Sequence, residues 1–232
     1  MRAVCHAERI RMAVAALILD MDGLMVDTEP LYKTAWQQAS AEVGFDLNDE
    51  RYAMIVGRTM AGCERVLVDQ FGPTFPVERV RERRPVLWRE EVERRGVQPK
   101  PGLLELLALA DTHGLRTAVA TSTNAETAAF TLGRSGLAGR ISTVVTGDQI
   151  AHSKPAPDIY LEAARRLGVD PAACLAIEDS EAGVLSIANA GMRGILVPHW
   201  PASDLAQRTA WRVVDSLHDA CDLVAGLLVE EH

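Results

Sequence analysis

Two pairs of acidic residues in the sequence each follow a short apolar run. Asp20 and Asp22 form the first pair, and Glu178 and Asp179 form the second. A carboxylate can attack phosphorus and form an aspartyl-phosphate, but the carboxylate and the phosphate are both anionic and repel each other. Mg²⁺ removes that obstacle because it binds carboxylates together with phosphate oxygens. The pattern therefore predicts phosphoryl-transfer chemistry, with Asp20 as the nucleophile and with Asp179 or Glu178 joining it as ligands of Mg²⁺.

Asp22 lies two residues after Asp20. In a regular strand both side chains would share one face. This spacing places Asp22 to protonate the leaving oxygen and later to activate water. Gly23 then allows the backbone to turn and to approach a phosphate closely. Taken alone, this short motif is also typical of a turn or of a fragment of a calcium loop, so its meaning depends on residues elsewhere in the chain.

Two further groups could stabilise a phosphoryl group. Thr121 offers a hydroxyl, and the amides that open the following helix offer further donors. Lys154 offers a compact, fixed positive charge that suits a tight anionic site. It is one of only three lysines in a chain with 21 arginines. Taken alone, Thr121 has a simpler interpretation as a helix N-cap and Lys154 as a loop residue. Their order and position together favour a functional site.

Short apolar runs alternate with helical patterns along most of the chain. The runs predict strands buried on both faces, at residues 15–19, 117–120, 143–145, 175–177 and 194–197. Apolar spacing predicts helices at residues 103–109, 125–132, 159–167 and 182–190. This alternation indicates βαβ units and a parallel sheet in an α/β fold. Ligands bind at the carboxyl ends of the strands in such sheets, and the polar residues described above follow those ends.

Residues 30–98 show no pattern of a buried strand. They predict helices at residues 31–43, 49–56, 61–70 and 77–95, with Pro85 interrupting or kinking the last one. We therefore expect an all-helical unit at 30–98, inserted into a core formed by 13–29 and 99–232, with an N-terminal extension at 1–12. Arginine and glutamate alternate along residues 77–95, which favours a solvated helix face with i,i+4 pairs. A phosphate-binding patch is the alternative.

Four segments together resemble the motifs of the haloacid dehalogenase superfamily, and within it the β-phosphoglucomutase-like phosphatases with a helical cap. The segments are DMDGLMVDTE at 20–29, Thr121, SKPAPD at 153–158 and EDSEAG at 178–183. The resemblance covers about residues 14–200. It implies a Rossmann-like three-layer core with a parallel sheet, and a helical cap inserted after the first strand.

The same resemblance implies roles for individual residues. Asp20 would be the nucleophile and Asp22 the general acid/base, with Thr121 and Lys154 completing the catalytic set. Mg²⁺ would bind Asp20, the Asp22 carbonyl and Asp179. Glu178 would be a fourth ligand or a support for the other ligands.

Two other reactions occur among proteins that this chain resembles. Relatives that displace halide from carbon lack the second aspartate of the first motif, so Asp22 favours reaction at phosphorus. Sugar phosphomutases of this type carry a histidine shortly after the first motif, and here Tyr32 takes that position. A tyrosine cannot easily act as an imidazole. We therefore predict a phosphatase, with a β-phosphoglucomutase-type sugar phosphomutase as the alternative.

Substrate recognition is predicted between the cap and the helix that follows the second strand. Gly57 and Arg58 are the cap candidates, with a turn and a surface residue as the simpler interpretations. Ser122, Thr123 and Asn124 are the core candidates, and Asn124 could equally be a helix N-cap. The predicted substrate is a small phosphorylated metabolite such as a sugar phosphate. Phosphoglycolate and nucleotide-derived phosphates stay open.

Composition narrows the possible partners and the compartment. The net charge of −8 and the pI near 5.3 argue against nucleic acid or an anionic membrane as a partner. The four cysteines are scattered and lack metal-ligand spacing, which is typical of the reducing cytosol. The longest apolar run near the N-terminus is too short to cross a bilayer. We therefore expect a cytoplasmic protein that is a monomer or a weak homo-oligomer.

Overall fold

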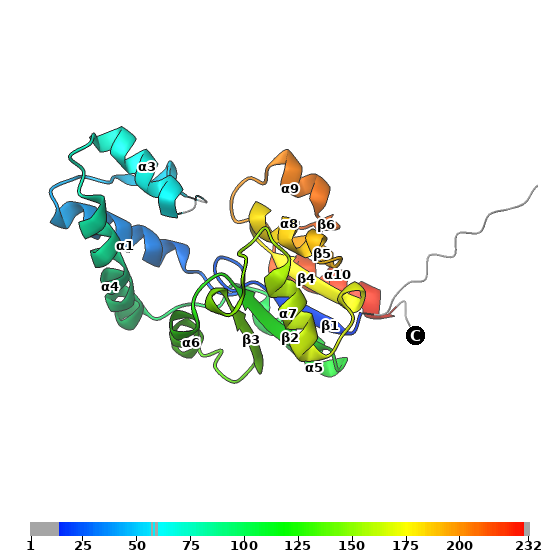
Figure 1. Cartoon of the computed structure of the whole chain (residues 1–232). Coiled ribbons are helices and arrows are strands. Elements are labelled where there is room, and N and C mark those ends of the chain that lie inside the picture. The colour runs from blue at the N-terminus through cyan, green and yellow to red at the C-terminus, as the bar shows by residue number, and fades with distance from the viewer. Residues whose placement is uncertain (1–13, 57, 59, 230–232) are drawn as a thin grey trace, which may run out of the picture.

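The computed structural model describes residues 14–56, 58 and 60–229, which form a parallel six-stranded sheet flanked by helices and a separate helical lobe (Figure 1). The sheet order is β3-β2-β1-β4-β5-β6, and every neighbouring pair is parallel. The strands are β1 (Ala16–Leu19), β2 (Arg116–Thr121), β3 (Thr143–Thr146), β4 (Cys174–Glu178), β5 (Arg193–Leu196) and β6 (Arg212–Val213). The central position of β1 places the residues that follow it in the middle of the sheet edge.

The central strands are buried on both faces because their apolar residues alternate between two hydrophobic clusters. In β1, Leu17 and Leu19 belong to one cluster, whereas Ala16 and Ile18 belong to the other. Small alanines recur on the second face, and the buried Tyr160 packs there. Burial on both faces explains why these strands are continuous apolar runs in the sequence.

Helices cover the two faces of the sheet. On one face α5 packs against α10 and β2, and on the other α7 packs against β2 and β3 while α8 packs against β4 and β5. The core helices are α5 (Leu103–Thr112), α6 (Ala125–Arg134), α7 (Asp158–Leu167), α8 (Glu181–Asn189), α9 (Asp204–Thr209) and α10 (Leu217–Val229). Two 3-10 turns, η1 (Gly147–Gln149) and η2 (Pro171–Ala173), complete the core. The sheet with a helical layer on each side confirms the predicted Rossmann-like three-layer α/β core.

Helices α1 to α4 form the lobe beside the sheet (Figure 1). They are α1 (Glu29–Glu42), α2 (Asp49–Ala53), α3 (Met60–Phe71) and α4 (Val77–Arg95), and α1 packs along α4. The two chain segments that join the lobe to the core run together. The Asp27 amide donates to the Gln98 carbonyl at 2.9 Å, and the Lys100 amide donates to the Met25 carbonyl at 2.9 Å. This arrangement confirms the expected fold class with a helical cap.

The structure also departs from the sequence-based expectations. The short strand β6 was not predicted, because both of its residues are exposed and carry no apolar pattern. Helix α4 spans the predicted residues 77–95 and is not interrupted at Pro85. Arg95 makes the predicted i,i+4 pair with Glu91 of the same helix, whereas Arg81 pairs with Glu64 of α3. Among the described residues, no helix is long and apolar enough to cross a membrane.

Candidate active site

Three parallel strands end side by side and bring Asp20, Thr121 and Glu178 together. Leu19 pairs in register with Val119 of β2 and with Ile177 of β4. The Asp20 amide extends the ladder by donating to the Ile177 carbonyl at 3.1 Å. Asp20, Thr121 and Glu178 are all buried, although each is polar. Buried polar groups need partners, so this edge of the sheet must be stabilised by a hydrogen-bond network.

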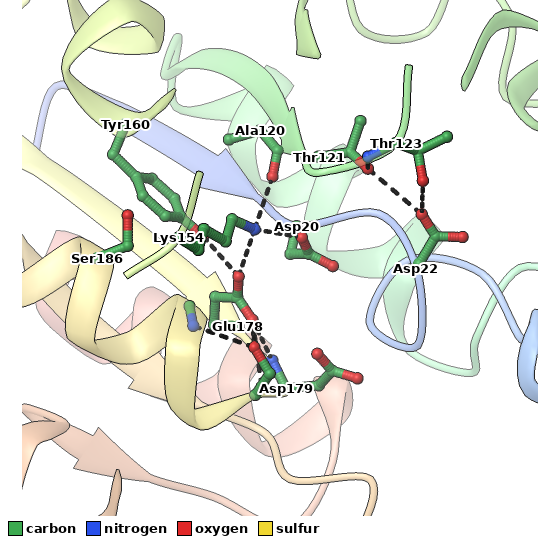
Figure 2. Close-up of polar contacts among 12 residues, drawn as sticks. Asp20, Asp22, Ala120, Thr121, Thr123, Lys154, Tyr160, Glu178, Asp179 and Ser186 are labelled. Atoms are coloured by element: carbon green, nitrogen blue, oxygen red, sulfur yellow. Dashed lines mark hydrogen bonds and ion pairs between the residues drawn. The ribbon is translucent and has the colours of Figure 1, made fainter. Parts of the chain in front are cut away.

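Lys154 lies at the centre of that network (Figure 2). Its ammonium donates to Asp20 Oδ1 at 2.5 Å, to Glu178 Oε1 at 2.5 Å and to the Ala120 carbonyl at 3.1 Å. The Lys154 side chain is 7% exposed. Burial opposes its charge, but Asp20 and Glu178 outweigh that effect and raise the pKa of Lys154. The ammonium therefore stays charged between two carboxylates.

Glu178 is engaged at both of its oxygens. Oε1 accepts from Lys154 and from the Tyr160 hydroxyl at 2.9 Å. Oε2 accepts from the amides of Asp179 and Ser180 and from the Ser180 hydroxyl, at 3.0 to 3.1 Å. Burial alone would raise the pKa of Glu178, but Lys154 and these donors outweigh that effect and lower it. A Cβ added to Gly183 would lie 1.8 to 2.2 Å from the Glu178 carboxyl group, so this glycine leaves room for the carboxylate.

Asp22 differs from Asp20 in its surroundings. Its Oδ2 accepts from the Thr123 hydroxyl at 2.8 Å and from the Thr121 hydroxyl at 3.3 Å. Its Oδ1 is buried and has no hydrogen-bond partner among the described residues. Burial raises the pKa of Asp22, and the hydroxyls of Thr123, Thr28 and Thr121 oppose that rise. One oxygen is thus held by the protein, while the other has no partner among the described residues.

Asp20, Glu178 and Asp179 each offer an oxygen within 4.8 Å of the others. Burial and the charge of Glu178 raise the pKa of Asp20 well above its usual range, and they raise the pKa of Asp179 to about 8. Three carboxylates against the single ammonium of Lys154 leave two negative charges when all are ionised. An all-oxygen donor set with this charge fits a hard divalent cation, which would lower both pKa values again.

The absence of a side chain at Gly23 leaves room for the Asp179 carboxylate. Gly23 has a φ of +84°, which other residues rarely adopt, and an added Cβ would lie 2.1 Å from Asp179 Oδ2. The turn after Asp22 therefore leaves room for the Asp179 carboxylate, a contact that the sequence motif did not indicate.

The predicted substrate-binding residues are distributed around the cleft. Ser122, Thr123 and Asn124 line the same cavity as Arg58, between the core and the lobe. Asn124 is indeed a helix N-cap, because its Oδ1 accepts from the Thr127 amide at 2.9 Å. Gly57 lies outside the described residues.

Sequence reasoning missed three residues at the site. Tyr160 was part of a predicted amphipathic helix, and nothing in the sequence indicated that its hydroxyl reaches Glu178. Arg84 was counted within the solvated arginine-rich face, yet it is partly buried and stacks over the Trp36 ring at 5.1 Å. Trp88 lies one turn further along α4 and stacks on Tyr32, with 5.5 Å between the ring centroids. The sequence did contain one signal for the last two residues. Arg84 and Trp88 follow the buried Val80 at intervals of four residues, which places all three on the same face of the helix.

Comparison with known proteins assigns the family. The haloacid dehalogenase-like hydrolase family matches residues 14–191. Protein CbbY of Rhodobacter capsulatus is 35% identical over 215 residues, which cover 88% of this chain and 94% of that protein. Hexitol phosphatase B of Escherichia coli is 31% identical over 199 residues, covering 80% of this chain and 84% of its own length.

Solved structures agree with that assignment. CbbY from Rhodobacter sphaeroides in complex with phosphate superposes with a TM-score of 0.74 at 27% identity, covering 89% of this chain and 96% of that chain. β-Phosphoglucomutase from Clostridium difficile superposes with a TM-score of 0.73 at 22% identity, covering 94% and 98%, and shows the same fold. The chain belongs to the haloacid dehalogenase-like hydrolases and is a phosphoric monoester hydrolase.

Proposed function

We propose that this enzyme hydrolyses the phosphate monoester of a small metabolite, a sugar phosphate in the first instance, with Mg²⁺ as cofactor and Asp20 as nucleophile. The contrast between the two aspartates carries this proposal. Asp20 is held by Lys154, whereas Asp22 keeps one buried oxygen without a partner. A fixed nucleophile beside a carboxyl group that is free to exchange a proton is the pair that two-step phosphoryl transfer requires.

Mg²⁺ would be held by Asp20, Asp179 and the Asp22 carbonyl. When bound, it would offset the electrostatic repulsion between the Asp20 carboxylate and the phosphate. Glu178 supports this site without supplying a ligand in our proposal, because both of its oxygens are already engaged by protein donors. Its part is to hold Lys154 and the turn that carries Asp179.

The reaction then has two steps. An Asp20 oxygen attacks phosphorus, the bond between phosphorus and the sugar oxygen breaks, and Asp22 gives that oxygen a proton. In the second step a water molecule attacks phosphorus while Asp22 takes a proton from that water. The bond between phosphorus and Asp20 then breaks and inorganic phosphate is released. Lys154, the Thr121 hydroxyl and the amides that open α6 stabilise the charge on the phosphoryl oxygens.

Hydrolysis is favoured over phosphomutase activity by Tyr32. Burial, and after it the charge of Asp22, raise the pKa of Tyr32, so the phenol stays protonated. It can donate a hydrogen bond beside Asp22 but cannot exchange protons as an imidazole does near neutral pH. The phosphatase names of several relatives, including a fructose-1-phosphate phosphatase from Escherichia coli that is 30% identical, support the same choice.

We further propose that residues 30–98 act as a cap over a core formed by 13–29 and 99–232. The paired linker segments at residues 25–27 and 98–100 would allow the cap to open and close over Asp20. Closure would exclude bulk water until the substrate is in place.

A phosphate-release screen tests the proposal. The panel would hold sugar phosphates, phosphoglycolate and nucleoside monophosphates, each assayed with Mg²⁺ and with a chelator. We expect release from at least one sugar phosphate that requires the cation and is lost in Asp20→Asn. A sugar-phosphate isomerisation assay runs beside it. Isomerisation that exceeds phosphate release would contradict the hydrolase assignment.

A further inference from the structure

The ammonium group of Lys154 uses all of its protons inside the protein. It carries three protons and has three acceptors at 2.5 to 3.1 Å, which are Asp20 Oδ1, Glu178 Oε1 and the Ala120 carbonyl. A lysine side chain is long and flexible, and it loses much rotamer freedom when it is held in one geometry. Keeping the ammonium between the two carboxylates therefore requires packing as well as charge.

Tyr160 of α7 contacts Lys154 and Glu178 at the same time (Figure 2). Lys154 Nζ lies over the Tyr160 ring, 5.2 Å from the ring centroid, which is a cation–π distance. The Tyr160 hydroxyl donates to Glu178 Oε1 at 2.9 Å. Burial, and after it the charge of Glu178, raise the pKa of Tyr160, so the hydroxyl keeps its proton. Because Tyr160 is fully buried, its packing fixes the place of both contacts.

Tyr160 and Lys154 share one oxygen of Glu178. Oε1 accepts from both of them, whereas Oε2 accepts from three other donors. A carboxylate has about four lone-pair sites, so these five donors compete for its charge. The Tyr160 hydroxyl therefore limits the attraction that Glu178 exerts on Lys154. Without the hydroxyl, the ammonium would be drawn toward Glu178 and away from Asp20.

The backbone beside Lys154 is held by a different element. Two side chains of α8, Asn189 and Ser186, donate to the carbonyls of the first and second residues after Lys154, at 2.9 and 2.6 Å. These bonds fix where the lysine side chain begins. They do not reach its ammonium, whose only aromatic neighbour among the described residues is Tyr160.

We propose that Tyr160 is a positioning residue, whose ring and hydroxyl together keep the Lys154 ammonium on Asp20, from where it serves the phosphoryl oxygens. This inference rests on the proposed phosphatase function and adds a residue to its machinery. Tyr160 touches neither the substrate nor the metal in this account, so its effect on the rate passes through Lys154. A tyrosine that only filled the core would contribute stability and leave the rate unchanged.

A double-mutant cycle tests whether Tyr160 acts through Lys154. The kcat/KM for phosphate release is measured with Mg²⁺ for the native enzyme, Tyr160→Phe, Lys154→Met and the double variant. The substrates are p-nitrophenyl phosphate and the best sugar phosphate of the phosphate-release screen. Tyr52→Phe is the matched control, because Tyr52 of α2 is also buried and its hydroxyl donates to Glu29 Oε1 at 2.8 Å. Urea unfolding checks that each variant is folded.

The small number of lysines allows a second measurement that needs no turnover. Lysine labelled with ¹³C at Cε gives one ¹³C signal each for Lys33, Lys100 and Lys154, the three lysines of the chain. The Lys154 signal is the one that disappears in Lys154→Met. If that variant does not fold, Lys154→Arg provides the assignment, and this signal decides the inference together with the rate of Tyr160→Phe.

We expect Tyr160→Phe to lower kcat/KM by about tenfold in the native enzyme but by less than about twofold in Lys154→Met. The Lys154 signal should move in Tyr160→Phe, whereas the signals of Lys33 and Lys100 should stay. Tyr52→Phe should leave the Lys154 signal in place and change kcat/KM by less than about twofold.

Three results overturn the inference alone while the native enzyme still releases phosphate. They are an unmoved Lys154 signal in Tyr160→Phe, an undiminished kcat/KM in that variant, and an equal fold loss with and without Lys154. Absence of phosphate release from every compound of the screen overturns the proposed function, and the positioning role with it.

Discussion

The core end and the cap end of the cleft treat their charges in opposite ways. At the core end, Lys154 contacts two carboxylates and a carbonyl at 2.5 to 3.1 Å, and Glu178 is saturated by five donors. At the cap end, Arg84 and Trp88 each keep a buried nitrogen without a partner. The difference teaches that the charges around Lys154 are paired within the protein, whereas the cap end keeps two buried donors that the protein does not use.

Removing Lys154 should have the largest effect. Lys154→Met leaves Asp20 and Glu178 buried without their shared counter-charge, which should lower stability by about 3 kcal/mol and kcat/KM by about a thousandfold. Urea unfolding and phosphate release measure the two effects. Lys33→Met is the control, since Lys33 pairs with Asp49 on the surface of the lobe. Equal losses of stability and of kcat/KM in both variants would contradict a particular role of Lys154.

The second-largest effect is expected when the carboxylate of Asp22 is replaced. Asp22→Asn should slow cleavage of an alkyl phosphate by about a hundredfold, because the leaving alkoxide needs a proton. Cleavage of p-nitrophenyl phosphate should fall much less, since that leaving group departs without one. The two substrates are compared by kcat/KM at saturating Mg²⁺, because this constant reports the first step and not the later attack of water on the phosphorylated Asp20. The same fold loss for both leaving groups would count against Asp22 as the acid.

Filling the space beside Glu178 should disturb the core end without removing any charge. In Gly183→Ala the new methyl group would overlap the Glu178 carboxyl group, which five donors hold in place. We expect a loss of about 2 kcal/mol in stability and of about tenfold in kcat/KM. Gly226→Ala is the control, because nothing lies within 4 Å of a Cβ added to Gly226. A Gly183→Ala enzyme as stable and active as that control would contradict the tight fit around Glu178.

The smallest effect is expected from a cluster of charged side chains on α7. Arg165 and Arg166 lower the pKa of Glu162 from 4.5 to about 2. The stabilisation from this ionised glutamate is complete above pH 4.5 and is lost as the pH falls toward 2. Because the cluster is solvent-exposed, Glu162→Gln should lower Tm by only about 2 °C or less at neutral pH. The Tm difference should shrink in acid, and a difference that grows there would contradict the sign.

The sequence predicted the four cap helices and the first five strands with bounds close to those observed, but it did not predict β6, α9 or α10 of the core. The strands that meet at Asp20 were recognisable because burial on both faces makes them continuous apolar runs, and their carboxyl ends then fixed where the polar residues lie. The exposed pair of residues in β6 carried no such pattern. In the cap, alternating arginine and glutamate hid Arg84, since composition does not show which side of a helix faces a cavity. The roles of the individual site residues stay predictions until they are tested.

The transfer of the phosphoryl group to Asp20 is the central claim. It is tested most directly by mixing enzyme with a slight excess of a cleaved substrate and Mg²⁺, quenching in acid within milliseconds, and mapping the modified peptide by mass spectrometry. Our account predicts the added mass of one phosphoryl group on Asp20, dependent on Mg²⁺ and absent from Asp20→Asn. Rapid phosphate release with no modified Asp20 at any quench time, or with undiminished turnover in Asp20→Asn, would contradict it.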